Sequence, residues 1–226
     1  MKRQTNRLIL LSAIFLSGLY ILSSCTEENN NGPTIFYSDI VSCHLNDDKS
    51  VYFEQILRDD QGCIILRPDE PVINEEIQED QRILLQYLVN STPSDSLYNI
   101  TATYLSAIRY DTIAHATADS IATYPNDLVR MNALWRTGGY INLDISLEYY
   151  YRTHKLDLFY SPQQTASDTL DVILRHDRND DIQGYWTQTY ASFYIPEALN
   201  PDYKAIRIHA NMPNDPIGYT VIKLRD

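Results

Sequence analysis

The sequence is poor in positive charge, in glycine and in long apolar segments. Its 226 residues hold 18 Lys and Arg against 30 Asp and Glu, a formal charge of −12, and only 7 Gly. Because a phosphate backbone is bound through clusters of cations, this balance argues against nucleic acid as a partner. A glycine-rich phosphate loop and a Gly-x-Ser-x-Gly nucleophile elbow are both missing. The sequence therefore gives no sign of the common nucleophile or nucleotide-binding enzymes.

The histidines do not indicate a metal site. They stand at positions 44, 115, 154, 176 and 209, without the HxH or HxxxH spacing of a local zinc site. Asp177–Asp181 places oxygen side chains at positions one, three and five, as a calcium loop does. However, Ile182 and Gln188 stand where such a loop needs Gly and Glu. We expect a polar loop between strands there, and neither a metal nor a cofactor in the chain.

The one long apolar block lies near the N-terminus. A basic head at residues 1–7 precedes a 15-residue apolar run at 8–22, which predicts a signal peptide over residues 1–24. A permanent transmembrane helix needs about 20 apolar residues. Leu22-Ser23-Ser24-Cys25 resembles the bacterial lipobox, whose cysteine receives diacylglycerol and then a further acyl chain such as palmitate. We predict that Cys25 is lipidated; the alternatives are a free thiol after ordinary cleavage or an uncleaved helical anchor.

A polar tether over residues 25–33 follows the predicted lipidation site. Its acidic residues Glu27 and Glu28 resemble the signal that carries Bacteroidetes lipoproteins to the outer leaflet of the outer membrane. We therefore expect a lipid-anchored outer-membrane protein exposed at the cell surface, with a periplasm-facing anchor as the alternative. Removing residues 1–24 takes away three cations and no acid, so the mature chain has 15 cations, 30 acids and a charge of −15.

The remainder of the chain predicts an all-β fold. Apolar residues recur at period two in short runs that end at turn residues. Arg82–Val89 could also place apolar residues on a helix face, but Pro93 follows closely and we expect a strand. Tyr98–Tyr110 is long enough that it must bend or serve two partners. The predicted strands are Val51–Leu57, Cys63–Leu66, Arg82–Val89, Tyr98–Tyr110, Leu128–Leu134, Tyr140–Tyr150, Lys155–Tyr160, Leu170–Arg175, Thr187–Ile195, Ala205–Ala210 and Tyr219–Leu224.

The last seven strands, in about 100 residues after the small and polar segment Ala114–Pro125, predict a two-sheet antiparallel sandwich. Tyr140–Tyr150 alternates most regularly. Its residues Ile141, Leu143, Ile145, Leu147 and Tyr149 should face the core, and Asn142, Asp144, Ser146 and Glu148 should face solvent.

Two cysteines besides Cys25 remain in the mature chain, and both fall in apparent strands. They are Cys43 and Cys63, and the protein would be exported to a compartment where disulfides persist. The sequence is therefore compatible with a cross-strand disulfide and with two free thiols.

Aromatic residues give the only candidates for a binding site. Three tyrosines in succession end at Tyr151, and adjacent residues of a strand face opposite sides, so some of these rings should be exposed. Exposed Tyr and Trp can stack on sugar rings or anchor a protein partner. The alternative is that the rings plug the ends of the sandwich. Our candidate ligand-binding residues are Trp135, Tyr150, Tyr185 and Trp186.

The order of these features resembles the NigD-like lipoproteins of Bacteroidetes. The resemblance rests on the lipobox and tether, on Gln81–Val89 and Tyr98–Tyr110, and on the runs Trp135–Leu143 and Ala191–Ile195. It implies an N-terminal OB-like barrel over residues 34–113 and a C-terminal β-sandwich over 114–226. It also implies a role in bacteriocin immunity, the activity proposed for the member that names the family, and it supplies no catalytic motif.

We therefore expect a non-enzymatic lipoprotein that recognises a partner and is held to the membrane by its lipid anchor. A cationic peptide or protein, such as a bacteriocin, suits the charge of −15. The alternative is a carbohydrate-binding lipoprotein of a glycan-uptake system, which would use the exposed aromatic rings. A third hypothesis is a hydrolase whose catalytic carboxylates are distant in the sequence and come together only in the folded protein.

Overall fold

A computed structural model describes residues 34–57, 62–73, 76–161, 168–199, 203–216 and 218–223. The predicted signal peptide, Cys25 and the tether lie outside these residues. Within them, no helix is both long and apolar enough to cross a bilayer. The residues from Phe36 onward belong to one compact unit, and the description below concerns that unit.

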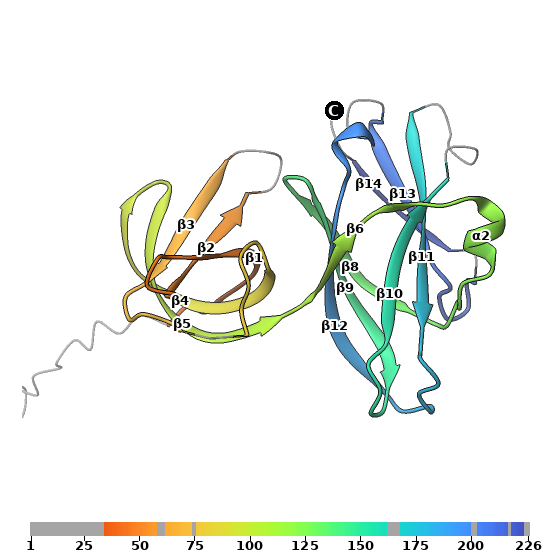
Figure 1. The fold of residues 1–226 in the computed structure, drawn as a ribbon, viewed down its shortest axis with the longest axis horizontal. Helices are drawn as coiled ribbons and strands as arrows, with labels where there is room; N and C mark the ends of the chain where they lie inside the picture. Colours follow the sequence, from red (N-terminus) through yellow and green to blue (C-terminus); the bar gives the residue numbers. More distant parts are fainter. Residues whose placement is uncertain are drawn as a thin grey trace, which may run out of the picture. The chain divides into compact units, whose positions relative to one another are not determined.

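The first five strands close into a barrel, as expected (Figure 1). Their order around the barrel is β1-β2-β3-β5-β4, and β3 pairs with β5 in parallel. Gly62 precedes β3 with φ +101°, a positive φ that glycine adopts without steric cost. Buried apolar residues of all five strands fill the interior. The strands are β1 (Tyr37–Leu45), β2 (Val51–Ile56), β3 (Cys63–Pro68), β4 (Arg82–Ser94) and β5 (Leu97–Ala107).

The other strands form the two sheets of a β-sandwich, which confirms the predicted fold class. One sheet has the order β14-β13-β11-β10-β7 and the other has the order β6-β12-β9-β8. The strands are β6 (Arg109–Thr112), β7 (Ala114–His115), β8 (Arg130–Thr137), β9 (Tyr140–Tyr149), β10 (Lys155–Tyr160), β11 (Thr169–Asp177), β12 (Tyr185–Tyr194), β13 (Ala205–His209) and β14 (Tyr219–Lys223). Two short helices, α2 (Ala118–Ala122) and the 3-10 turn η4 (Glu197–Leu199), complete the described elements.

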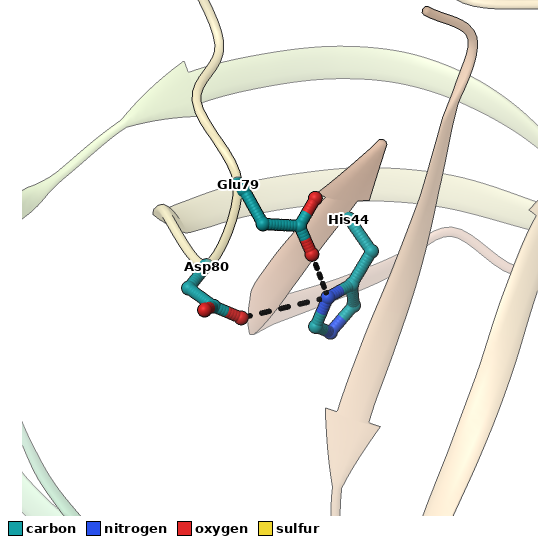
Figure 2. A group of neighbouring side chains, drawn as sticks. All are labelled: His44, Glu79 and Asp80. Carbon is teal, nitrogen blue, oxygen red and sulfur yellow. Dashed lines mark hydrogen bonds and ion pairs between the residues drawn. The ribbon is translucent and has the colours of Figure 1, made fainter. Parts of the chain in front are cut away.

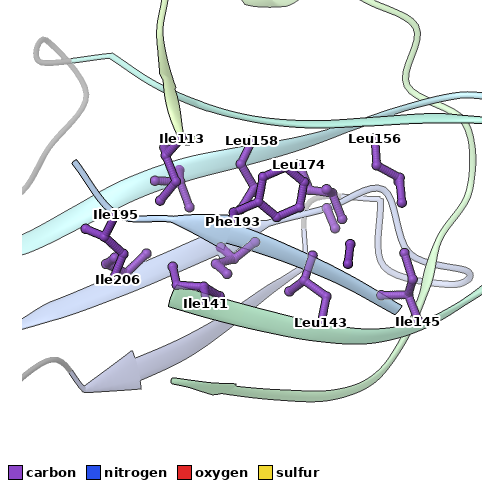
Figure 3. Close-up of a cluster of buried hydrophobic side chains, with 14 of the residues drawn as sticks. Ile113, Ile141, Leu143, Ile145, Leu156, Leu158, Leu174, Phe193, Ile195 and Ile206 are labelled. Atoms are coloured by element: carbon purple, nitrogen blue, oxygen red, sulfur yellow. The ribbon is translucent and has the colours of Figure 1, made fainter. Parts of the chain in front are cut away.

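The core of the sandwich lies between the two sheets and draws on both (Figure 3). Ile141, Leu143 and Ile145 of β9 are fully buried, as the alternation predicted, and they face residues such as Leu158 and Leu174 of the other sheet. Burial of a side chain of this size stabilises a fold by about 1.5–3 kcal/mol.

The strand pairing in the sandwich is mixed, whereas we expected it to be antiparallel. β6 pairs with β12 in parallel, β7 with β10 and β13 with β11. The cause is the chain path: each of these pairs joins strands that are not consecutive, so no hairpin forces them to be antiparallel. The predicted long strand Tyr98–Tyr110 does serve two partners, since β5 ends in the barrel at Ala107 and β6 begins at Arg109.

Asn142 departs from the predicted pattern, because it is completely buried on the face expected to be wet. The Arg82 guanidinium, also fully buried, covers it: Nη2 donates to Asn142 Oδ1 at 3.2 Å and Nε donates to Ser192 Oγ at 3.2 Å. Nη1 donates to Ser42 Oγ at 2.9 Å, and the guanidinium carbon lies 4.4 Å from the centre of the Tyr140 ring. Desolvation lowers the pKa of Arg82 from 12.5 to about 10, so the group is still charged at neutral pH.

Cys43 and Cys63 are both free thiols. Cys43 is buried in the barrel on β1, Cys63 is exposed on β3, and β2 lies between the two strands. Because neighbouring strands are about 4.8 Å apart, residues two strands away exceed the roughly 7 Å that a disulfide can span. The alternative of a cross-strand bridge is therefore not realised. Burial raises the pKa of Cys43 to about 12.

Candidate functional site

Five large apolar or aromatic side chains are exposed around the point where β9 ends and β12 begins. Tyr149 and Tyr185 are register partners on these two strands, and the rings of Tyr150 and Tyr151 meet edge to face at 5.5 Å. Tyr185 is 82% exposed, and Tyr150 and Tyr151 are each 56% exposed. We call this group the aromatic tip: Tyr149, Tyr150, Tyr151, Ile182 and Tyr185.

A buried carboxylate holds the backbone of the aromatic tip. Asp181 Oδ2 accepts hydrogen bonds from the amides of Tyr150 at 2.8 Å and Tyr151 at 3.2 Å, and Oδ1 accepts one from the amide of Ile182 at 3.1 Å. Desolvation acts to raise the pKa of Asp181, but the hydrogen bonds from the amides of Tyr150 and Tyr151 and the one with His154 outweigh it and lower the pKa to about 2. One ionised side chain thus fixes both loops that carry the exposed rings.

Beneath Asp181 lies a chain of two buried histidines. His176 Nδ1 is 3.0 Å from the carbonyl oxygen of Leu128, which can only accept, so Nδ1 carries a hydrogen. His176 Nε2 lies 2.9 Å from His154 Nδ1, and His154 Nε2 lies 3.2 Å from Asp181 Oδ2. The two imidazole rings thus link the Leu128 carbonyl to the Asp181 carboxylate.

The loop between β11 and β12 is the polar loop that the sequence predicted. Asn179 and Asp180 both have left-handed φ angles, of 56° and 57°, and the amide of Asn179 donates to Asp177 Oδ1 at 2.7 Å. Gly184 packs so closely on the backbone carbonyl of Tyr149 that a Cβ would overlap it. The oxygens of Asp177 and Asp181 that resembled calcium ligands thus accept amide hydrogen bonds of the loops themselves.

The four predicted ligand-binding aromatics separate into two groups. Tyr150 and Tyr185 come together in the aromatic tip. Trp186 follows Tyr185 on β12 and faces the other side, where the Arg130 guanidinium lies 3.7 Å from its ring centre. Trp135 is partly buried on β8 and lines a pocket with Asp144 and Tyr190.

A second group of polar side chains lies on the barrel (Figure 2). His44 Nδ1, near the end of β1, is 2.8 Å from Glu79 Oε1 and 3.6 Å from Asp80 Oδ1. Nε2 of the same ring is 3.4 Å from Glu54 Oε2 on β2. The hydrogen bonds from His44 and from the amide of Leu45 lower the pKa of Glu79. No local spacing could have revealed this group, because Glu79 and Asp80 stand more than 30 positions from His44.

Comparison with known families identifies the domain in the second half of the chain. Residues 112–221 match the family model described as the NigD-like C-terminal beta sandwich domain. This chain carries a NigD-like C-terminal domain. The match spans β7 to β13, the aromatic tip and most of β14.

Solved structures share the fold with the whole described chain. A protein of unknown function from Bacteroides vulgatus is 20% identical, with a TM-score of 0.67 over 84% of this chain and 90% of its own. A protein described as a lipoprotein from Bacteroides fragilis is 13% identical, with a TM-score of 0.62 over 84% and 97%. A NigD-like immunity protein from Bacteroides caccae is 14% identical, with a TM-score of 0.56 over 82% and 91%. No curated protein matches the chain.

Proposed function

We propose that this NigD-like protein is a lipid-anchored protein of the outer-membrane surface that binds a cationic peptide or protein without catalysis. The observation that carries the proposal is the aromatic tip. Single exposed apolar residues are ordinary, but five together on a rigid base are typical of a recognition site. Tyrosine rings also bring large contact area at a low cost in side-chain entropy.

The charge of the chain supports a cationic partner. The mature charge of −15 is concentrated in the barrel, where residues 34–107 hold 13 Asp and Glu against 4 Lys and Arg. A field of this sign steers cations toward the protein and speeds their association. Many bacteriocins are cationic, and one structural neighbour is called a NigD-like immunity protein. Capture of such a peptide at the cell surface would be the corresponding role here.

The first test is binding of a panel of cationic bacteriocin-type peptides to the detergent-solubilised lipoprotein. Replacing both Tyr150 and Tyr185 by Ala should weaken binding at least 10-fold, because a central interface tyrosine contributes more than about 1 kcal/mol. Tyr104→Ala is the matched control, since Tyr104 is 48% exposed on the barrel strand β5. Equal losses in the control and in the tip variant would contradict a role for the tip.

Ionic strength gives a second test of the same binding. Steered association of opposite charges should weaken steeply above physiological salt, where the Debye length is about 8 Å. Salt-insensitive binding would contradict a cationic partner. Turnover of peptides, esters or glycans that one polar substitution abolished would contradict a non-catalytic role.

A carbohydrate ligand is the second candidate, because the exposed rings of Tyr150, Tyr151 and Tyr185 could equally stack on sugars. Saturable binding on a glycan array that the Tyr150 and Tyr185 replacements abolish, together with no binding of cationic peptides, would favour this candidate. The same pair of variants therefore serves both alternatives.

The anchor is tested at Cys25. Cys25→Ala should abolish labelling by a fatty-acid analogue and leave an uncleaved precursor in the cell. Protease added to intact cells should degrade the parent protein if it faces the medium and spare it if it faces the periplasm. Continued labelling of the Cys25→Ala protein would contradict the lipoprotein assignment.

A further inference from the structure

The His44 group on the barrel has a geometry that the proposed function does not use. Glu79 and Asp80 both point to the same nitrogen of the His44 ring (Figure 2). The backbone fixes this arrangement, because the amide of Asp80 donates to the Cys43 carbonyl at 2.9 Å and the Cys43 amide donates to the Gln81 carbonyl at 2.9 Å. The carboxylates are thus held beside the end of β1.

Hydrogen bonding alone does not satisfy this group. His44 Nδ1 can carry one hydrogen, yet two carboxylate oxygens face it, and a third carboxylate, that of Glu54, faces Nε2. Even a doubly protonated ring leaves three negative charges against one positive charge. In the described parts of the chain, the ion pairs recorded for these three carboxylates are all with His44.

The surroundings of the group match those of metal ligands. A histidine that binds a metal through one nitrogen usually donates a hydrogen bond from the other, often to a carboxylate, and ligating carboxylates are themselves hydrogen-bonded. Here Glu54 lies at Nε2 of His44, and Glu79 Oε2 accepts from the Leu45 amide at 2.7 Å. These partners leave His44 Nδ1, Glu79 Oε1 and Asp80 Oδ1 facing one another.

The spacing of the three facing atoms fits one ion. Ligands held about 2.0–2.2 Å from Zn²⁺ lie roughly 3–3.5 Å from one another. Nδ1 of His44 is 2.8 Å and 3.6 Å from the two carboxylate oxygens, and all three atoms lie within 4.8 Å of one another. Only small side-chain rotations would therefore be needed to enclose an ion.

We propose that His44 Nδ1, Glu79 and Asp80 bind a divalent transition-metal ion of the Zn²⁺ type, with water in the remaining positions. The imidazole favours Zn²⁺ over Ca²⁺ and Mg²⁺, which prefer oxygen ligands alone. The ion would link β1 to the segment before β4 and neutralise part of the excess negative charge. The proposal does not depend on the aromatic tip.

The test is a calorimetric titration of the metal-free, full-length lipoprotein with Zn²⁺. All variants carry Cys63→Ser, because an exposed thiol binds zinc by itself. We expect one Zn²⁺ per chain, at least a 10-fold loss of affinity in His44→Gln, and a loss of about 10-fold or more in Glu54→Gln, which removes a supporting partner. Ca²⁺ and Mg²⁺ at the same concentration should not compete.

Two further variants keep the test decisive. Asp80→Asn should also lower the affinity for Zn²⁺ at least 10-fold. This variant preserves the fold, because Asn tolerates the left-handed φ of 60° at this position. His209→Gln is the matched control, since His209 Nε2 pairs with Asp171 Oδ1 at 2.7 Å and, in the parts of the chain that the structure describes, with no second carboxylate. Zinc affinity that is unchanged in His44→Gln and Asp80→Asn, or the lack of saturable binding below millimolar zinc, would overturn the proposal.

Discussion

Replacing Arg82 by Met should leave the protein as stable as the parent or more stable, although it removes four hydrogen bonds. In the described chain these bonds go to hydroxyl, amide and carbonyl oxygens and not to a carboxylate. Burial lowers the pKa of Arg82 from 12.5 to about 10, and one pKa unit corresponds to about 1.4 kcal/mol. Moving Arg82 from water into this site therefore disfavours the charged guanidinium, relative to its neutral form, by about 3 kcal/mol, chiefly through desolvation.

Methionine removes this penalty and keeps an unbranched side chain that fills irregular space. The oxygens that lose a donor are partly satisfied, because the Ser192 hydroxyl still donates to Asn142 Oδ1 at 2.9 Å. One orphaned buried group costs about 1–3 kcal/mol. The free energy of unfolding should thus stay the same or rise by up to about 2 kcal/mol. Arg82→Ala bears the same loss of hydrogen bonds and adds a cavity, so it should be about 2–4 kcal/mol less stable than Arg82→Met.

Urea denaturation followed by circular dichroism measures both variants against the parent under one set of conditions. If the free energy of unfolding of Arg82→Met equals or exceeds that of the parent, and that of Arg82→Ala is clearly lower, the cost of desolvating the charge outweighs the contribution of its hydrogen bonds. If Arg82→Met is destabilised by more than about 3 kcal/mol, as much as Arg82→Ala, the hydrogen bonds are worth more than the desolvation costs and the reasoning fails.

Three further predictions follow from buried or crowded groups. Acidification from pH 7 to 5 should lower the unfolding temperature measured by calorimetry. Burial lowers the pKa of His176 below 6.5, so the unfolded chain binds the proton at a higher pH than the folded protein does. The variant His176→Gln should therefore show a weaker dependence of the unfolding temperature on pH. A second loss should appear below pH 3.8, as the pH approaches the Asp181 pKa of about 2. Gly184→Ala should destabilise the sandwich by more than about 1 kcal/mol in urea, since its Cβ would overlap backbone. A thiol reagent should label Cys63 in the native protein and Cys43 only after unfolding.

Much of the fold could be predicted from the sequence, because period-two alternation reports which face of a strand is buried. β9 shows both the strength and the limit of this rule. Ile141 and Leu143 are buried as predicted, but Asn142 is buried too, through Arg82, which stands 60 positions earlier in the chain. The parallel pairs and the short helix α2 were missed for a related reason: pairing between strands that are distant in the chain leaves no local pattern, and one helical turn is too short for a 3.6 period.

The candidate site was predictable only in its exposed part. Tyr150 and Tyr185 were identified by composition, and register pairing of β9 with β12 brings them together. His154, His176 and Asp181 looked like scattered polar residues, because the contacts that join them arise from three different segments of the folded chain.

The buried histidine chain bears on the recognition role proposed for the exposed rings. Binding costs free energy for every loop that must be ordered, so a loop already held in place binds more tightly than a mobile one. Asp181 accepts hydrogen bonds from the amides of Tyr150 and Tyr151, and these bonds, together with the one to His154, keep the pKa of the carboxyl low in a buried setting. The polar atoms beneath the aromatic tip therefore order its backbone before any partner arrives. The rings themselves contribute little to the core, which leaves them free to be selected for what they contact.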